Sequence, residues 1–199
     1  MKNILIFIFI TISSALFCQS KIQSYDTIPF TETVSGLNID MVFVKGGTYI
    51  MGCDIDQGRS CEDDEKPPHQ VTLSDFFIGK YEITQRQWFI VMEKNPSNFS
   101  ACDSCPVENV SWDDVQVFLE KLNAITGKKY ALPTEAQWEY AARGGNKSHG
   151  FKFAGSDNVN EVAWYFEGKE NKSMKTASTH IIGKKKPNEI GLYDMSGNV

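Results

Sequence analysis

The sequence has little histidine, no excess of basic residues and no apolar run long enough to span a membrane comfortably. Its 199 residues include three histidines, and 20 basic side chains stand against 25 acidic ones, a net charge of −5. This balance argues against a nucleic-acid partner, because phosphates call for a basic face. The short run Lys184-Lys185-Lys186 lies beside Pro187 and is typical of a solvated turn.

Common catalytic signatures are also absent from the sequence. The chain has no G-x-S-x-G nucleophile motif, no P-loop and no H-E-x-x-H zinc motif. His69, His149 and His180 are each isolated among loop-forming residues, which is typical of solvated or locally hydrogen-bonded side chains. The residues alone therefore identify no catalytic group.

The composition is that of one globular domain, with 41% hydrophobic and 23% charged residues. The N-terminus differs: Lys2 is followed by an apolar run over residues 4–12 and then by small and polar residues. This order predicts a signal peptide over residues 1–20 and an exported protein, periplasmic, on the cell surface or secreted. The run is shorter than the roughly 20 residues of a membrane span. Lipidation at Cys18, which would attach the protein to a membrane, stays open.

Four cysteines remain after such cleavage: Cys53, Cys61, Cys102 and Cys105. An exported setting favours disulfides, and four cysteines allow three pairings. Proximity in the sequence favours Cys53–Cys61 and Cys102–Cys105. A four-cysteine zinc site is the alternative, although seven residues between the first two cysteines exceed the usual spacing.

Strand and loop patterns dominate the first part of the chain. Residues 21–40 read as a loose, polar leader. Residues 41–51 place two β-rich pieces around Gly46-Gly47, which predicts a hairpin. Residues 53–69 are acidic and rich in turn formers, and they predict an exposed loop.

Three helix starts share one local chemistry, an N-cap acceptor followed three residues later by a side chain that can reach back. These pairs are Thr84 with Gln87, Ser111 with Asp114, and Thr134 with Gln137. We predict helices over residues 84–92, 111–125 and 134–143. Helical spacing assigns Val115, Phe118, Leu119 and Leu122 to the buried face of the second helix. The chain after Gly145 reads as mostly irregular, so the class is α+β.

Five segments, in this order, carry a family resemblance. They are FVKGGTYIMG (43–52), EKPPHQVTLSDFFIGKYEITQRQW (65–88), CPVENVSWDDVQVFLEKLN (105–123), LPTEAQWEYAARGG (132–145) and KPNEIGLYDMSGNV (186–199). Together they resemble the N-terminal and central part of the formylglycine-generating-enzyme, or sulfatase-modifying-factor, domain. The resemblance implies a C-type-lectin-like α+β fold over residues 41–199, with little regular structure and incomplete at its C-terminus. Ala131 and Gln137 stand where the family usually has arginine and glutamate.

The resemblance also implies expectations about function. In the sulfatase-activating relatives, a later segment holds the paired cysteines that bind copper and attack the substrate thiol. The five segments stop before it, so no catalytic role passes to Cys102 or Cys105. We expect a non-catalytic binding or scaffold module with an unidentified protein partner. The alternative is part of a copper- and oxygen-dependent oxidase that converts a cysteine of a sulfatase-type polypeptide to formylglycine, inactive as the chain is given.

One metal site follows from the same resemblance. The block at Asp194 wraps a calcium ion in the relatives, with Asp194 matching a side-chain ligand and Gly197 and Val199 matching backbone carbonyl ligands. Such oxygen ligands suit a hard cation. A glycine turn with an ordinary capping aspartate is the alternative reading.

Overall fold

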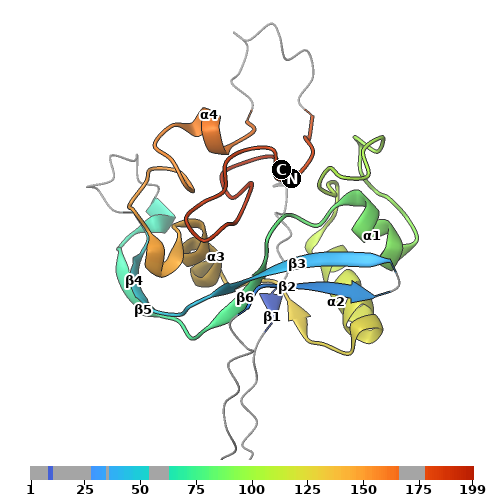
Figure 1. Cartoon of the computed structure of the whole chain (residues 1–199), viewed down its shortest axis with the longest axis horizontal. Helices are drawn as coiled ribbons and strands as arrows, with labels where there is room; N and C mark the ends of the chain where they lie inside the picture. The colour runs from blue at the N-terminus through green and yellow to red at the C-terminus, as the bar shows by residue number, and fades with distance from the viewer. Residues whose placement is uncertain (1–8, 11–27, 35, 54–62, 166–177) are drawn as a thin grey trace, which may run out of the picture.

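A five-stranded antiparallel sheet, in the order β2-β3-β6-β1-β7, forms the centre of the molecule, and β4 and β5 form a separate two-stranded sheet (Figure 1). The computed structural model describes residues 9–10, 28–34, 36–53, 63–165 and 178–199. The strands are β1 (Phe9–Ile10), β2 (Phe30–Val34), β3 (Leu37–Val44), β4 (Thr48–Met51), β5 (His69–Thr72), β6 (Phe76–Gly79) and β7 (Tyr130–Ala131). The helices are α1 (Gln85–Met92), α2 (Trp112–Thr126), α3 (Glu135–Ala142) and α4 (Val159–Val162), with 3₁₀ turns η2 (Asp63–Glu65) and η3 (Gly145–Lys147).

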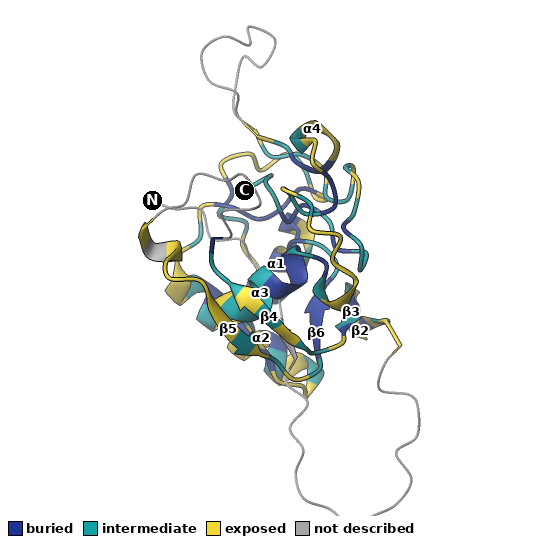
Figure 2. Ribbon diagram, turned by 90° about the vertical axis from the view of Figure 1, so that its left-hand side faces the viewer, coloured by how far each residue is buried: buried dark blue, intermediate teal, exposed yellow. Residues whose placement is uncertain are grey.

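Both faces of the large sheet pack against a core. Successive side chains of a strand point to opposite faces, so one strand contributes to both cores. Leu37, Ile39 and Met41 of β3 join one core with α1 and α2. Val42 and Val44 join a second core with α3 and the C-terminal loop. Figure 2 colours much of β3 and β6 as buried. The sheet therefore separates a helical side from a loop-rich side.

The three predicted helices are confirmed, and each begins with the predicted capping box. In each box the N-cap oxygen accepts the backbone N–H three residues on, and the side chain there accepts the N-cap N–H. This exchange satisfies donors that the first turn leaves unpaired. Val115, Phe118, Leu119 and Leu122 are buried, as the helical spacing predicted.

The predicted hairpin around Gly46-Gly47 does not form. β3 pairs with β2 and β6, whereas β4 pairs with β5, so the two glycines connect two sheets. A Cβ on Gly46 would lie 2.3 Å from the carbonyl oxygen of Leu73. The glycine is required by this close crossing of two backbones and not by a turn. Asp75 accepts the Gly46 N–H at 2.9 Å and holds the crossing.

Regular structure also begins earlier than the sequence predicted. β2 lies inside the expected leader and pairs with β3 from Phe30↔Met41 to Val34↔Leu37. Its alternating threonines are exposed, because β2 lies at the edge of the sheet, and they gave the segment its polar character. Phe9 and Ile10, from the expected signal segment, form β1 between β6 and β7. No helix in the described ranges combines the length and apolarity that crossing a membrane requires.

Candidate functional site

The C-terminal loop is fixed on the loop-rich side of the sheet by hydrogen bonds to both neighbouring elements. The Asn188 side chain donates to the carbonyl of Ala141 at 2.7 Å, which ties the loop to the end of α3. The backbone N–H of Tyr193 donates to the carbonyl of Lys80 at 3.2 Å. Leu192 and Met195 fill the second core. Asp194 is thereby carried against the connection between β6 and α1.

Asp194 is only 1% exposed, although it carries a carboxylate. Its Oδ2 accepts the backbone N–H of Gly183 at 2.7 Å, whereas its Oδ1 has no hydrogen-bond partner in the described part of the chain. Burial raises the pKa of Asp194, against the opposing effect of the Gly183 bond. The backbone at Asp194 is left-handed, with φ 58°, which turns the chain sharply at this point.

Glu82 is a second buried carboxylate in the same place, with 2% exposure. Its Oε2 accepts from the side-chain amide of Asn198 at 2.9 Å, and the backbone N–H of Val199 also donates to the carboxylate. No partner among the described residues reaches its Oε1. Burial, and then the neighbouring Asp194 carboxyl, raise the pKa of Glu82 well above its usual range.

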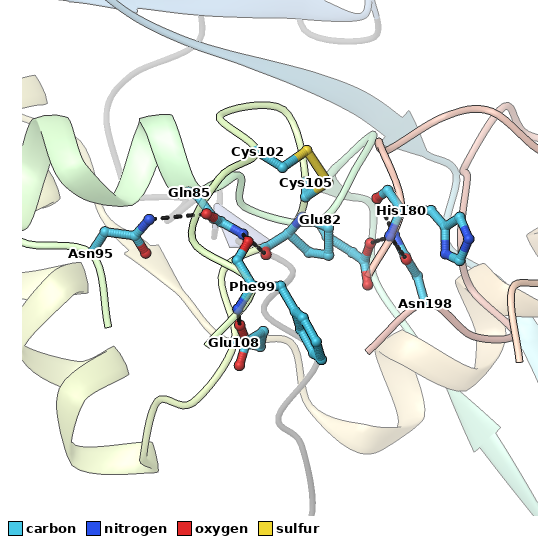
Figure 3. The surroundings of a disulfide bond; sticks show 10 residues. Glu82, Gln85, Asn95, Phe99, Cys102, Cys105, Glu108, His180 and Asn198 are labelled. Carbon is cyan, nitrogen blue, oxygen red and sulfur yellow. Dashed lines mark hydrogen bonds between the residues drawn. A yellow bond between two sulfur atoms is a disulfide. The ribbon is translucent and has the colours of Figure 1, made fainter. Parts of the chain in front are cut away.

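His180 and Trp164 form one wall beside these carboxylates. Asn198 accepts the backbone N–H of His180 at 2.8 Å and donates back to its carbonyl at 3.1 Å, as Figure 3 shows together with the bond to Glu82. The rings of His180 and Trp164 stack with centroids 4.0 Å apart and planes 2° apart. The Lys185 ammonium lies 4.0 Å from the centroid of the Trp164 ring. Trp164 therefore packs against both His180 and Lys185.

The residues present fit a hard cation. Each of the two buried carboxylates offers an oxygen without a hydrogen bond, and an unpaired buried charge is costly. Gly197 lies so close to Trp164 that a Cβ would meet its carbonyl oxygen at 2.4 Å, so the loop depends on glycine there. No group of three or more His, Cys, Asp or Glu side chains converges among the residues that the structure describes. Carboxylate oxygens suit calcium better than zinc. The calcium site at Asp194, Gly197 and Val199 stays a prediction.

The sequence identified only part of this group. It placed Asp194, Gly197 and Val199 in one loop, but it missed Glu82. The one available signal was a single acidic residue between Tyr81 and Ile83, two residues before the Thr84 N-cap.

Cys102 and Cys105 form a disulfide beside the start of α1 (Figure 3). The backbone N–H of Gln85 donates to the carbonyl of Cys105 at 2.9 Å, so the disulfide loop extends the cap of α1. Ile182 donates its N–H to the carbonyl of Ser104 at 3.1 Å, which connects the same loop to the C-terminal region. This pair thus acts as a structural staple.

The structure describes only one cysteine of the other predicted pair. Cys53 is disulfide-bonded, whereas its expected partner Cys61 lies outside the described residues. The Cys53–Cys61 pairing therefore stays a prediction.

A separate cavity of about 330 Å³ lies beside α3. Its walls are aromatic and apolar, with polar groups at Glu139, Arg143, Lys152 and Ser196; the apolar residues are Trp138, Ala142, Phe151, Phe153, Ala154 and Met195. A second cavity, of about 500 Å³, shares Trp138, Glu139 and Arg143 with the first.

Two of the residues that line both cavities form an ion pair. The Arg143 guanidinium lies 2.7 Å from the Glu139 carboxylate. Glu139 accepts the Gly52 N–H at 3.0 Å, and Arg143 donates to the Gly52 carbonyl at 2.6 Å. The pair therefore joins α3 to Gly52, the residue that follows β4.

Comparisons with known proteins identify the family. Residues 29–199 match the model of the sulfatase-modifying factor enzyme 1-like domain. The chain is 36% identical over 207 residues to the chaperone protein LppX of Paenibacillus barcinonensis, covering 80% of this chain and 69% of the relative. It is 25% identical to the inactive C-alpha-formylglycine-generating enzyme 2 of Bos taurus, covering 84% and 71%.

A solved structure agrees with this result. Treponema denticola variable protein 1 superimposes with a TM-score of 0.69 at 28% identity, covering 86% of this chain and 74% of that one. The expected α+β fold is thereby confirmed. The chain belongs to the sulfatase-modifying factor enzyme 1-like domain family.

Proposed function

We propose that this protein is an exported, non-catalytic member of its family that binds a polypeptide partner. The observation that carries the proposal is the 36% identity to a relative named as a chaperone. A second relative is named as an inactive enzyme, so loss of catalysis has occurred within the family. The described part of the chain also uses Cys102 and Cys105 as a disulfide staple and not as thiols.

The aromatic cavity beside α3 is the surface that we assign to the partner. Its volume of about 330 Å³ suits one large apolar side chain, and aromatic anchors that fill such cavities dominate binding energies at interfaces. Phe151 and Phe153 are half-buried, so they present ring area without needing to unfold the loop. The Glu139–Arg143 pair in the cavity lining provides polar contacts that suit the backbone of an extended chain.

Calcium has a structural role in this proposal. The ion would be held by the Asp194 side chain and by the carbonyls of Gly197 and Val199, and it would supply positive charge to a buried carboxylate. Binding to the folded state alone stabilises that state by mass action. The ion would thereby order the loop that lines the cavity at Met195 and Ser196.

Suppression of aggregation tests the proposed function. At equimolar ratio the protein should lower the light scattering of heat-denatured citrate synthase by about half or more, since a protein that binds unfolded chains keeps them from associating. Phe151→Ala with Phe153→Ala should remove the effect. The matched control is Phe89→Ala with Phe99→Ala, which removes two exposed rings on the α1 side and should leave it unchanged.

A parallel assay addresses the enzymatic alternative. The protein is incubated with copper, oxygen and a peptide carrying the sulfatase-type Cys-x-Pro-x-Arg sequence, and mass spectrometry follows conversion of thiol to aldehyde. We expect no turnover above a copper-only control. Turnover that is lost in Cys102→Ser or Cys105→Ser would overturn the non-catalytic proposal and also the staple role of that pair.

A further inference from the structure

We propose that the second cavity, of about 500 Å³, takes a cationic side chain of the same polypeptide whose apolar side chain occupies the cavity beside α3. This inference rests on the partner site proposed above and adds to it the chemistry by which one segment is chosen over another. The two cavities share Trp138, Glu139 and Arg143. One extended segment that crosses these residues would therefore place side chains in both.

The first support is the balance of charge in the second cavity. Its lining includes three carboxylates and two cations, which are Glu65, Glu135, Glu139, Lys66 and Arg143. Both cations already have a carboxylate partner: Arg143 lies 2.7 Å from Glu139, and Lys66 lies 3.1 Å from Asp63. Glu135 forms no ion pair within the part of the chain that the structure describes. The cavity thus presents a negative charge that these cations do not balance.

The second support is the effect of the same groups on Tyr49, whose hydroxyl donates to the carbonyl of Ala136 at 2.8 Å. Burial raises the pKa of Tyr49, and the carboxylates of Glu139 and Glu135 raise it further. The Arg143 guanidinium lowers this pKa, but by less than Glu139 raises it. The electrostatic field beside α3 is therefore negative in spite of the ion pair, and such a field favours a cation.

The third support is the indole ring of Trp138, which is half-buried. The ring packs against the second core and also lines both cavities, so it is held in place while part of it stays exposed. A cation over the face of a tryptophan ring is attracted by its π-electrons. Glu135 precedes Trp138 by three residues on α3, so the two side chains are neighbours on the helix surface. A cation in the second cavity would meet both the carboxylate and the ring.

Lys152 gives the two cavities different preferences. Lys152 lines the first cavity, whereas Glu135 lines the second. A cationic side chain of the partner is repelled by Lys152 and attracted by Glu135. We therefore expect the apolar side chain in the first cavity and the cation in the second, which sets the direction of the bound segment.

Fluorescence anisotropy with labelled peptides tests the inference on the full chain. The probes are short Gly- and Ser-rich peptides with one central tryptophan, which differ only in whether lysine, glutamine or glutamate flanks it on both sides. The lysine peptide should bind about fivefold more tightly than the glutamine peptide, the combined effect of an exposed ion pair and a cation–π contact. The glutamate peptide should bind most weakly, and added salt should reduce the preference for lysine.

Glu135→Gln separates a local contact from general attraction to an acidic protein. Glu135 is exposed and takes no part in the cap formed by Thr134 and Gln137, so the variant should fold. Its preference for the lysine peptide should fall below about twofold, with the affinity for the glutamine peptide unchanged. Glu120→Gln, which removes an exposed carboxylate on α2, is the matched control and should keep the full preference. Equal losses of preference in the two variants would overturn the inference.

Glu135→Lys provides a readout that damage to the fold does not imitate. With the charge reversed, the glutamate peptide should bind more tightly than the lysine peptide, because unlike charges are matched and like charges are opposed. A preference for lysine that survives in Glu135→Lys would refute the role of this cavity.

The same peptides distinguish this inference from the function on which it rests. If the three peptides bind the unmodified protein equally, and Phe151→Ala with Phe153→Ala abolishes their binding, the partner site stands and the cationic subsite is refuted. If the glutamate peptide binds most tightly, the second cavity takes an anion and the inference is wrong. If no peptide binds, the partner site and the subsite both fail.

Discussion

Glu32 shows how a buried carboxylate is held when its partners come from the chain itself. It is 8% exposed and accepts from the Tyr130 hydroxyl at 2.5 Å and from the Lys128 ammonium. Burial alone would raise the pKa of Glu32, but the bonds from Lys128 and Tyr130 outweigh it and lower the pKa below its usual 4.5. The surroundings of Glu32 thus favour its ionised form, whereas burial disfavours the ionised forms of Glu82 and Asp194.

The lowered pKa of Glu32 predicts a pH-dependent contribution to stability. A carboxyl with a lowered folded pKa stabilises fully above its unfolded pKa and loses that contribution as the pH falls through the folded value. At pH 7, Glu32→Gln should cost about 2 kcal/mol, a typical value for hydrogen bonds to a charged group. The cost should shrink as the pH falls below 4.5.

Urea unfolding of both proteins between pH 7 and pH 3 measures this difference. Glu120→Gln, an exposed carboxylate on α2, is the control and should show no comparable pH dependence. A Glu32→Gln cost that stays constant down to pH 3 would contradict the assignment.

Single residues also show what the sequence could not predict. The sequence could point to Asp194 because its loop belongs to a segment that resembles a family motif. Glu82 was not, because nothing local distinguishes a buried glutamate from a solvated one. Its burial arises only when the loop at Asn198, far along the chain, packs over it.

At the scale of elements, helices were predictable and strand pairing was not. Each helix start is encoded within four consecutive residues, as in Ser111 to Asp114, so the sequence fixes it without knowledge of the fold. Pairing depends on segments that are far apart. Gly46-Gly47 therefore resembled a hairpin turn, although its glycine serves a crossing against Leu73.

Removal of one cap should have a local and measurable cost. The Ser111 hydroxyl accepts the Asp114 N–H at 3.1 Å, and the Asp114 carboxylate accepts the Ser111 N–H at 3.0 Å. Ser111→Ala should lower the free energy of unfolding by about 1 kcal/mol, the usual value of an N-cap. Ser100→Ala, in an exposed loop, should change it by less than about 0.5 kcal/mol. Equal losses in the two variants would show that the cap contributes nothing specific.

At the scale of the whole molecule, the large sheet has two cores and one inserted strand. β3 and β6 contribute side chains to both cores, so the same two strands pack against the helical side and the loop-rich side. β7 pairs in the described residues only with β1, which comes from the apolar N-terminal segment. The site at Glu82 lies just beyond the end of β6, the other partner of β1.

This arrangement predicts the effect of removing residues 1–20, the segment expected to be cleaved on export. Without β1, one edge of β6 and the facing edge of β7 lose their backbone partners, and exposed strand edges exchange amide hydrogens quickly. Exchange should therefore rise in residues 76–79 and 130–131. β2 and β3 keep their own pairing over five residue pairs and should exchange as before, which makes them the internal control.

The same comparison decides how β1 relates to the fold. Tyr130 keeps two bonds that do not involve β1, its N–H to the Asn123 side chain at 2.6 Å and its hydroxyl to Glu32 at 2.5 Å. Truncation should thus loosen the sheet locally and leave the helical core, including the Trp88–Phe118 stack, intact. Unfolding of the whole helical side after truncation would show instead that the N-terminal segment is part of the folded domain. Unchanged exchange throughout would show that β1 adds no protection to its neighbours.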